Sequence, residues 1–125
     1  MTVMVAYSHT DEGMVALEKA RDAADRLQAP VVVFDLESPS KSADRRIALP
    51  EDAQKGERWL GPAHTAPAPV EDLLDTAREI DVALIVVGIR RRSPVGKLIL
   101  GSQAQSIILG ADVPVLSVKA SGADA

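Results

Sequence analysis

Cysteine is absent from the 125-residue chain, which excludes disulfide bonds, thiol catalysis and cysteine-based zinc sites. This absence fits a reducing compartment, so we expect a cytoplasmic location. Aromatic residues are almost as scarce, with one Trp, one Tyr and one Phe. The core must therefore be aliphatic, and the chain has no aromatic platform on which nucleic-acid bases would stack.

Long apolar runs and an excess of positive charge are also missing. No stretch approaches the roughly 18 apolar residues that a membrane-spanning helix needs, and the N-terminus does not resemble a signal peptide. Eighteen acidic residues against 14 basic ones give a net charge of −4. We therefore expect neither a nucleic acid nor a membrane as partner. The two histidines, His9 and His64, have no metal-site spacing, so no metal site is predicted.

The remaining pattern alternates short apolar runs with amphipathic stretches, in a length that suits one domain. Strands are expected over residues 3–7, 31–36, 82–87 and 113–118, and helices over 11–28, from 70 and from about 103. Thr10 should cap the first helix, whose buried face is predicted to be Met14, Leu17, Ala20, Ala24 and Leu27. Such an alternation predicts a mainly parallel sheet flanked by helices. Ligands of these sheets bind beyond the carboxyl ends of the strands, where the strand order reverses.

Residues 37–68 are the least regular part, because proline and glycine interrupt any long element. A short helix around residues 51–58 and a strand near Trp59 are the elements expected there.

The segment from Val86 to Ser102 carries most of the functional information. We expect a buried strand to end in Gly88, followed by a loop, after which Gly101 and Ser102 open a helix. Ser102 and Gln105 have the spacing of a capping box. Glycines let a backbone approach a ligand and helix N-termini attract anions, so the segment is typical of a phosphate cradle, although each feature alone could be structural.

A P-loop is excluded in the same segment. Gly96 and Lys97 would need a glycine at position 91 and a hydroxyl at position 98, where Arg91 and Leu98 stand. Lys97 could still offer a charge to a phosphate.

The segment resembles the nucleotide loop of the universal stress protein family, in which Gly, two residues, Gly, nine residues and Gly precede Ser or Thr. Gly88, Gly101 and Ser102 stand at the family's spacing, whereas Arg91 replaces the second glycine. The first strand and helix, the apolar run before Gly88 and residues 111–118 also look like the family. Residues 37–69 do not.

The resemblance implies an α/β fold, namely a three-layer α/β/α sandwich of the adenine nucleotide alpha hydrolase type. Its five-stranded, mainly parallel sheet would have the order 3-2-1-4-5. It implies one domain over residues 1–120, a disordered tail over 121–125, and a homodimer formed through the last strand. It further implies binding of ATP or a related adenine nucleotide, with Mg²⁺ as an optional companion, in a stress-response regulatory role.

Site residues carry over from the family position by position. Gly88, Gly101 and Ser102 would cradle phosphates. Arg91, which departs from the family, could either block the cradle or offer its guanidinium to a phosphate, and Lys97 could add charge. Ser8, His9 and Leu36 would hold adenosine.

Two departures keep an alternative open. Ser8-His9-Thr10 replaces the Asp-Gly-Ser of nucleotide-binding relatives, and Arg91 replaces a glycine. The chain could therefore be a dimerisation or partner-docking module that binds no nucleotide. No residue is placed as a catalytic base, so we expect no enzyme, or at most very slow ATP hydrolysis.

Overall fold

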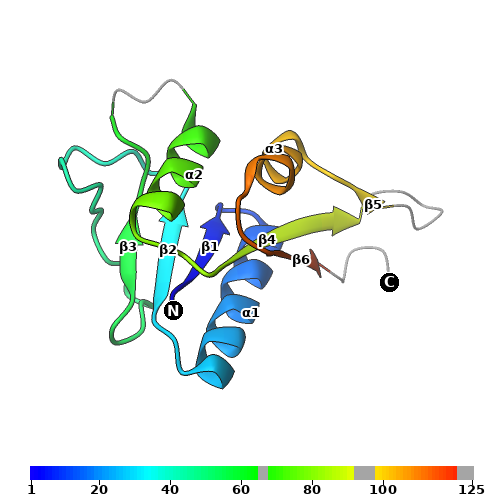
Figure 1. The fold of residues 1–125 in the computed structure, drawn as a ribbon, viewed down its shortest axis with the longest axis horizontal. Coiled ribbons are helices and arrows are strands. Elements are labelled where there is room, and N and C mark those ends of the chain that lie inside the picture. The colour runs from blue at the N-terminus through cyan, green and yellow to red at the C-terminus, as the bar shows by residue number, and fades with distance from the viewer. Residues whose placement is uncertain (65–67, 92–97, 121–125) are drawn as a thin grey trace.

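The computed structural model describes residues 1–64, 68–91 and 98–120, which form one twisted sheet with helices on both faces (Figure 1). Five strands run parallel in the spatial order β3-β2-β1-β4-β6. Their bounds are Val3–Tyr7 for β1, Val31–Asp35 for β2, Arg58–Leu60 for β3, Leu84–Arg91 for β4 and Val115–Ala120 for β6. When these five parallel strands are numbered in chain order, β6 is the fifth strand, and the order is the predicted 3-2-1-4-5. A two-residue strand, β5 (Leu98–Ile99), pairs antiparallel with the end of β4.

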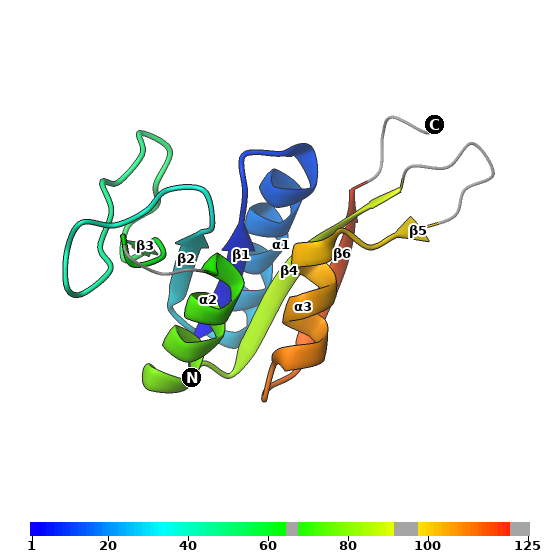
Figure 2. The ribbon, with the colours of Figure 1, turned by 90° about the horizontal axis from the view of Figure 1, so that it is seen from above.

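Helices cover the two faces unequally. Helix α1 (Asp11–Leu27) lies on one face, and α2 (Pro69–Glu79) and α3 (Ser102–Gly110) lie on the other (Figure 2). Alternate strand residues supply the two cores: Val3, Val5 and Val33 face α1, whereas Met4 and Phe34 face α2 and α3. This alternation is the period of a strand that is buried on both sides. The predicted three-layer α/β/α sandwich is confirmed.

Helix α1 begins where the sequence predicts, with the Thr10 hydroxyl accepting a hydrogen bond from the Gly13 N–H at 3.1 Å. Its predicted buried face is only partly correct, because Met14 and Leu27 are about half exposed. The residues that face the sheet are Gly13, Ala16, Leu17, Ala20 and Ala24. Small side chains dominate this stripe, so the helix lies close to β1 and β4.

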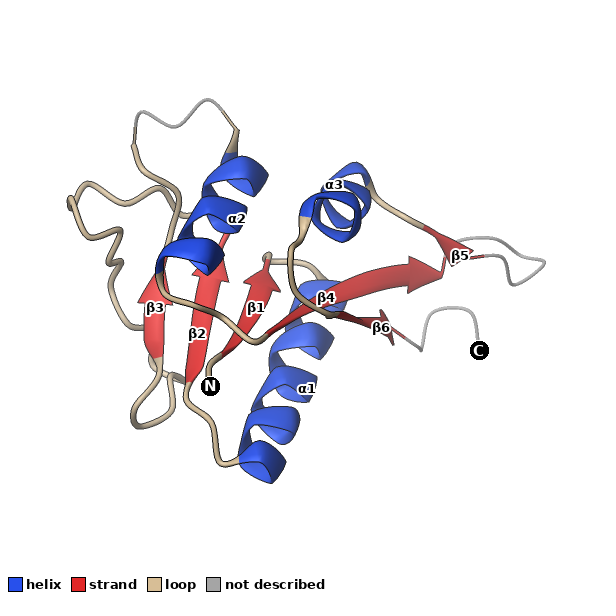
Figure 3. Cartoon of the chain, viewed as in Figure 1, coloured by secondary structure: helices blue, strands red, loops and turns tan. Residues whose placement is uncertain are grey.

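Strand β4 is longer than predicted, and Gly88 lies inside it rather than at its end. Beyond Val87 the strand leaves β1 and continues beside β6, with Gly88 paired to Val118 and Arg90 to Ala120. The ends of β1 and β4 therefore diverge, as Figure 3 shows. A crevice at this position is what a reversal of strand order produces.

The connection from β2 to β3 contains no helix, so the predicted helix over 51–58 is wrong. Two turns stand in its place, and Gly56 takes the left-handed φ of +84° that a tight turn needs. The predicted strand near Trp59 is confirmed as β3. Parallel neighbours are usually joined through a helix, so residues 36–57, here called the crossover segment, are the most unusual part of this fold.

Strand β6 starts two residues later than predicted. Pro114 has no N–H to donate, and its carbonyl accepts a hydrogen bond from the Ile85 N–H at 3.1 Å. The regular ladder with β4 therefore begins at Val115. Among the described residues, none of the helices has both the length and the apolar content to cross a membrane.

Candidate functional site

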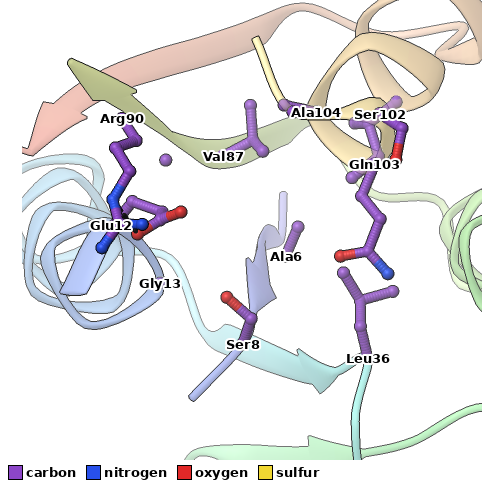
Figure 4. A pocket seen from close by; sticks show the side chains of 13 residues that line it. Ala6, Ser8, Glu12, Gly13, Leu36, Val87, Arg90, Ser102, Gln103 and Ala104 are labelled. Carbon is purple, nitrogen blue, oxygen red and sulfur yellow. Dashed lines mark ion pairs between the residues drawn. The ribbon is translucent and has the colours of Figure 1, made fainter. Parts of the chain in front are cut away.

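A pocket of about 370 Å³ opens where β1 and β4 diverge, between the first turns of α1 and α3. Ala6 and Val87 form part of its apolar lining at the strand ends. Glu12 and Arg90 lie together on one side, and Leu36 and Gln103 lie opposite (Figure 4). The pocket is therefore mixed in character, with an apolar base at the strand ends, a charged side at Glu12 and Arg90, and an opposite side that includes Leu36.

Five of the eight residues predicted for the site line this one pocket. They are Ser8, Leu36, Gly88, Gly101 and Ser102. They come from four separate places in the chain, and the parallel sheet brings them to one edge because the carboxyl ends of its strands meet there.

The start of α3 differs from the predicted capping box. Gly101 is the N-cap, and its carbonyl accepts the Gln105 N–H at 3.0 Å, so Ser102 is already the first helical residue. The helix start has no side-chain cap. The first backbone N–H groups of a helix have no partner within the helix, and here Ser102, Gln103 and Ala104 all line the pocket. This edge suits an anionic group.

Gly101 also leaves this edge accessible, because a Cβ built on it would meet no heavy atom of the described residues within 4 Å. Gly88 is different. A Cβ there would lie 2.1 Å from the carbonyl oxygen of Glu12, so this glycine permits β4 and α1 to approach each other. Gly88 therefore lines the pocket because β4 and α1 meet there in close contact.

His9 does not line this pocket. Its Nε2 donates to Oδ2 of Asp35 at 2.8 Å, and its backbone N–H donates to a carboxylate oxygen of Glu37. The hydrogen bond to Asp35 raises the pKa of His9 above its ordinary value, burial opposes this increase, and the negative charges of Asp35 and Glu37 add to it. His9 thus ties the end of β1 to the end of β2.

Two of the predicted site residues lie at or beyond the edge of the described residues. Arg91 is the last residue of β4, and the description covers its backbone but not its side chain. Lys97 and the tail over 121–125 lie outside the described residues.

Glu12 and Arg90 are pocket residues that the sequence reasoning did not select. The Oε1 atom of Glu12 is buried and has no hydrogen-bond partner within the described part of the chain, and the nearest cationic atom is Nε of Arg90 at 3.7 Å. Glu12 thus presents an acceptor that a donor on a ligand would satisfy. Their positions in the sequence could have identified Glu12 and Arg90, because both residues lie close to the ends of the strands that frame the crevice.

Comparison with known proteins places the chain in a family. The model of the universal stress protein family matches residues 63–119. A universal stress protein of Mycolicibacterium smegmatis is 34% identical over 128 residues, which cover 96% of this chain and 98% of that protein. The chain belongs to the universal stress protein family.

Solved structures of universal stress proteins have the same architecture. One from Archaeoglobus fulgidus is 28% identical with a TM-score of 0.67, covering 94% of this chain and 97% of that one. Another, solved in complex with cAMP, is 20% identical with a TM-score of 0.68, covering 97% and 98%. A third, from Archaeoglobus fulgidus in complex with dAMP, is 21% identical with a TM-score of 0.63, covering 94% and 96%. The adenine nucleotide alpha hydrolase-like fold expected from the sequence is therefore confirmed.

Proposed function

We propose that this universal stress protein binds an adenine nucleotide in the pocket between β1 and β4 and acts as a regulatory binding domain in a stress response. The observation that carries the proposal is the convergence of an anion-binding helix start, at Gly101 and Ser102, with an apolar wall that includes Leu36. Two family members of known structure were solved with cAMP and dAMP, which makes an adenine nucleotide the first ligand to test.

Different groups of the lining would contact the different parts of the nucleotide. The free N–H groups at the start of α3 and the guanidinium of Arg90 suit a phosphate, whereas Leu36 and Ala6 suit a planar base. Glu12 supplies the acceptor that a ribose hydroxyl would satisfy. Glu12 is the carboxylate of the described lining, so an accompanying Mg²⁺ would be held mainly by the phosphates.

Calorimetric titration with AMP, cAMP and ATP tests this function. Gly101→Val places a branched side chain at the mouth of the pocket, where the added Cβ itself meets nothing, so it should lower affinity about tenfold or more while the protein stays folded. Lys55→Ala, on an exposed turn outside the pocket, is the matched control. Wild-type protein that binds none of the three nucleotides at millimolar concentration would contradict the proposal.

Binding without turnover is part of the proposal. The described lining contains neither histidine nor cysteine, and its carboxylate, Glu12, lies beside a guanidinium. We expect at most very slow ATP hydrolysis. Phosphate release at about one per second or faster would place the protein among ordinary enzymes instead.

A bare sheet edge favours a second role, as a dimerisation module. Within the described residues β6 pairs with β4 alone, and Leu116 on it is 42% exposed. Edge strands left uncovered tend to pair, so we propose a homodimer through β6. Sedimentation should give a dimer that Leu116→Arg converts to monomer, with Met14→Arg, another exposed apolar position, as control. A monomer at tens of micromolar would contradict this assembly.

A further inference from the structure

A second pocket lies on the α1 side of the sheet, beneath the crossover segment. It has a volume of about 500 Å³ and shares no lining residue with the pocket between β1 and β4. It exists because residues 36–57 contain no helix: irregular backbone leaves a hollow beside Trp59 on β3, where a crossover helix would otherwise pack. We call it the crossover pocket.

The crossover segment is held in place by side-chain contacts at its middle and at its C-terminal end. Arg21 of α1 donates two hydrogen bonds to Glu57, at 2.6 and 2.9 Å, and the Trp59 indole N–H donates to the same carboxylate at 3.1 Å. Arg45 donates to the buried carboxylate of Asp72 in α2 at 2.9 Å. The walls of the pocket are therefore fixed before any ligand arrives, as small-molecule sites usually are.

Hydroxyl and backbone contacts fix the cationic side of the pocket in the same way. The Ser40 hydroxyl, in a buried residue, donates to the carbonyl of Arg46 at 2.7 Å and accepts the Ser42 N–H at 3.0 Å. The next residue, Ile47, donates its N–H to the carbonyl of Trp59 at 3.1 Å. Arg46 and Ile47 are thereby anchored beside β3.

The crossover pocket is lined by two basic side chains, Arg46 and Lys41, which differ in their partners. Asp35 is the carboxylate of the lining, and it accepts from His9 Nε2, the Ser38 hydroxyl and the Glu37 N–H at 2.8, 2.8 and 3.0 Å. Arg46 is paired with Asp44 at 3.1 Å, whereas Lys41 has no ion-pair partner within the described residues. Lys41 is therefore the basic side chain of this lining that an anion can approach.

The apolar side of the pocket is suited to a flat ring. Trp59, Ile47 and Pro50 contribute to it, and the Tyr7 ring meets the Trp59 ring edge-on with centroids 5.4 Å apart. Aromatic groups pack favourably in such surroundings. We propose that the crossover pocket binds a small aromatic carboxylate, with its ring against Trp59 and Ile47 and its carboxylate toward Lys41. One lysine ammonium that has no ion pair within the described residues matches a monoanion better than a phosphate dianion.

The test uses the intrinsic fluorescence of Trp59, which is the only tryptophan in the chain. The full-length protein is titrated with 3-phenylpropionate and, in parallel, with the neutral 3-phenylpropionamide. We expect a saturable change in emission with the acid at a Kd of about 1 mM or below, and affinity for the amide about tenfold weaker. No saturable change with the acid up to about 10 mM, or equal affinity for acid and amide, would overturn the proposal.

Matched variants separate this site from the nucleotide pocket. Lys41→Ala should weaken binding of the acid about five- to tenfold, whereas Lys55→Ala, on the same segment but outside the lining, should leave it unchanged. Both lysines are exposed, so both variants should fold. Binding of the acid must persist in Gly101→Val and in the presence of AMP. Displacement by AMP, or an unchanged affinity in Lys41→Ala, would overturn the assignment, and a failure of AMP to bind would contradict only the nucleotide function.

Discussion

Gly88 in β4 lies directly against the backbone carbonyl of Glu12 in α1, so close that a Cβ at position 88 would fall 2.1 Å from that oxygen. The first turn of α1 therefore rests on the strand with no side chain between them. This contact sets the distance between Glu12 and Arg90, and with it one wall of the pocket.

Gly88→Ala should destabilise the protein, because strand or helix must shift to admit the methyl group. Overpacking of this kind costs about 1–3 kcal/mol. Gly101→Ser is the matched control, since no atom of the part of the chain that the structure describes lies within 4 Å of a Cβ there, and serine is a good N-cap. Urea unfolding of the two variants measures the difference. Equal stabilities would mean that α1 tolerates displacement from β4.

Asp72→Asn should lower the free energy of unfolding by about 2 kcal/mol, because it weakens the contacts of this buried carboxylate with Arg45 and the Ala63 N–H. Asp75→Asn removes an exposed carboxylate from the same helix, which is paired with Arg78, and should cost under about 0.5 kcal/mol. Similar losses in the two variants would show that the Arg45 contact does not anchor the crossover segment.

Lowering the pH should reduce the difference in the free energy of unfolding between wild type and Asp72→Asn. Burial disfavours the charged form of Asp72, but hydrogen bonds from Arg45 and Ala63 outweigh it and hold the pKa of Asp72 below its ordinary value. A lowered pKa gives stability that is present above the unfolded value of about 3.9 and is lost as the pH falls further. Urea unfolding at pH 7 and at about pH 3 checks the direction.

The difference in stability between wild type and His9→Gln should change with pH in the opposite direction to that for Asp72→Asn. The hydrogen bond to Asp35 raises the pKa of His9 above the 6.5 of a free side chain. The stability it contributes is therefore fully present below about pH 6.5 and is lost as the pH rises through the folded-state pKa. The free energy of unfolding of wild type should exceed that of His9→Gln most at about pH 5.5 and least at about pH 8. His64→Gln, at an exposed position, is the matched substitution.

Arg90→Gln should weaken nucleotide binding about tenfold, since a charge-assisted contact to a phosphate contributes about 1.5–3 kcal/mol. Arg26→Gln, an exposed arginine in the last turn of α1, should leave affinity unchanged. Glu12→Gln should strengthen binding of a phosphate slightly, because it removes a negative charge from the wall beside Arg90. Calorimetric titration of the three variants with a nucleotide ranks their affinities. Unchanged affinity in Arg90→Gln would place the phosphate elsewhere.

Local patterns determined much of the site in advance. The spacing of Gly88, Gly101 and Ser102 predicted the pocket edge, and Leu36 and Ser8 joined it because they follow parallel strands whose carboxyl ends meet. His9 failed to join because its ring turns to Asp35, a contact 26 residues away in sequence that no local pattern contains. Glu12 and Arg90 were missed for the same reason: their importance arises from the distance between α1 and β4.

The sequence by itself determined the alternation of strands and helices, the aliphatic core and the family, because these depend on residue periodicity and on motifs within short stretches of chain. Only the tertiary structure decided where β4 ends, which atoms Gly88 must avoid and how the crossover segment is held without a helix. Arg21 and Glu57, like Arg45 and Asp72, find each other across 36 and 27 residues. Contacts over such separations depend on how the elements pack, and no local spacing specifies them.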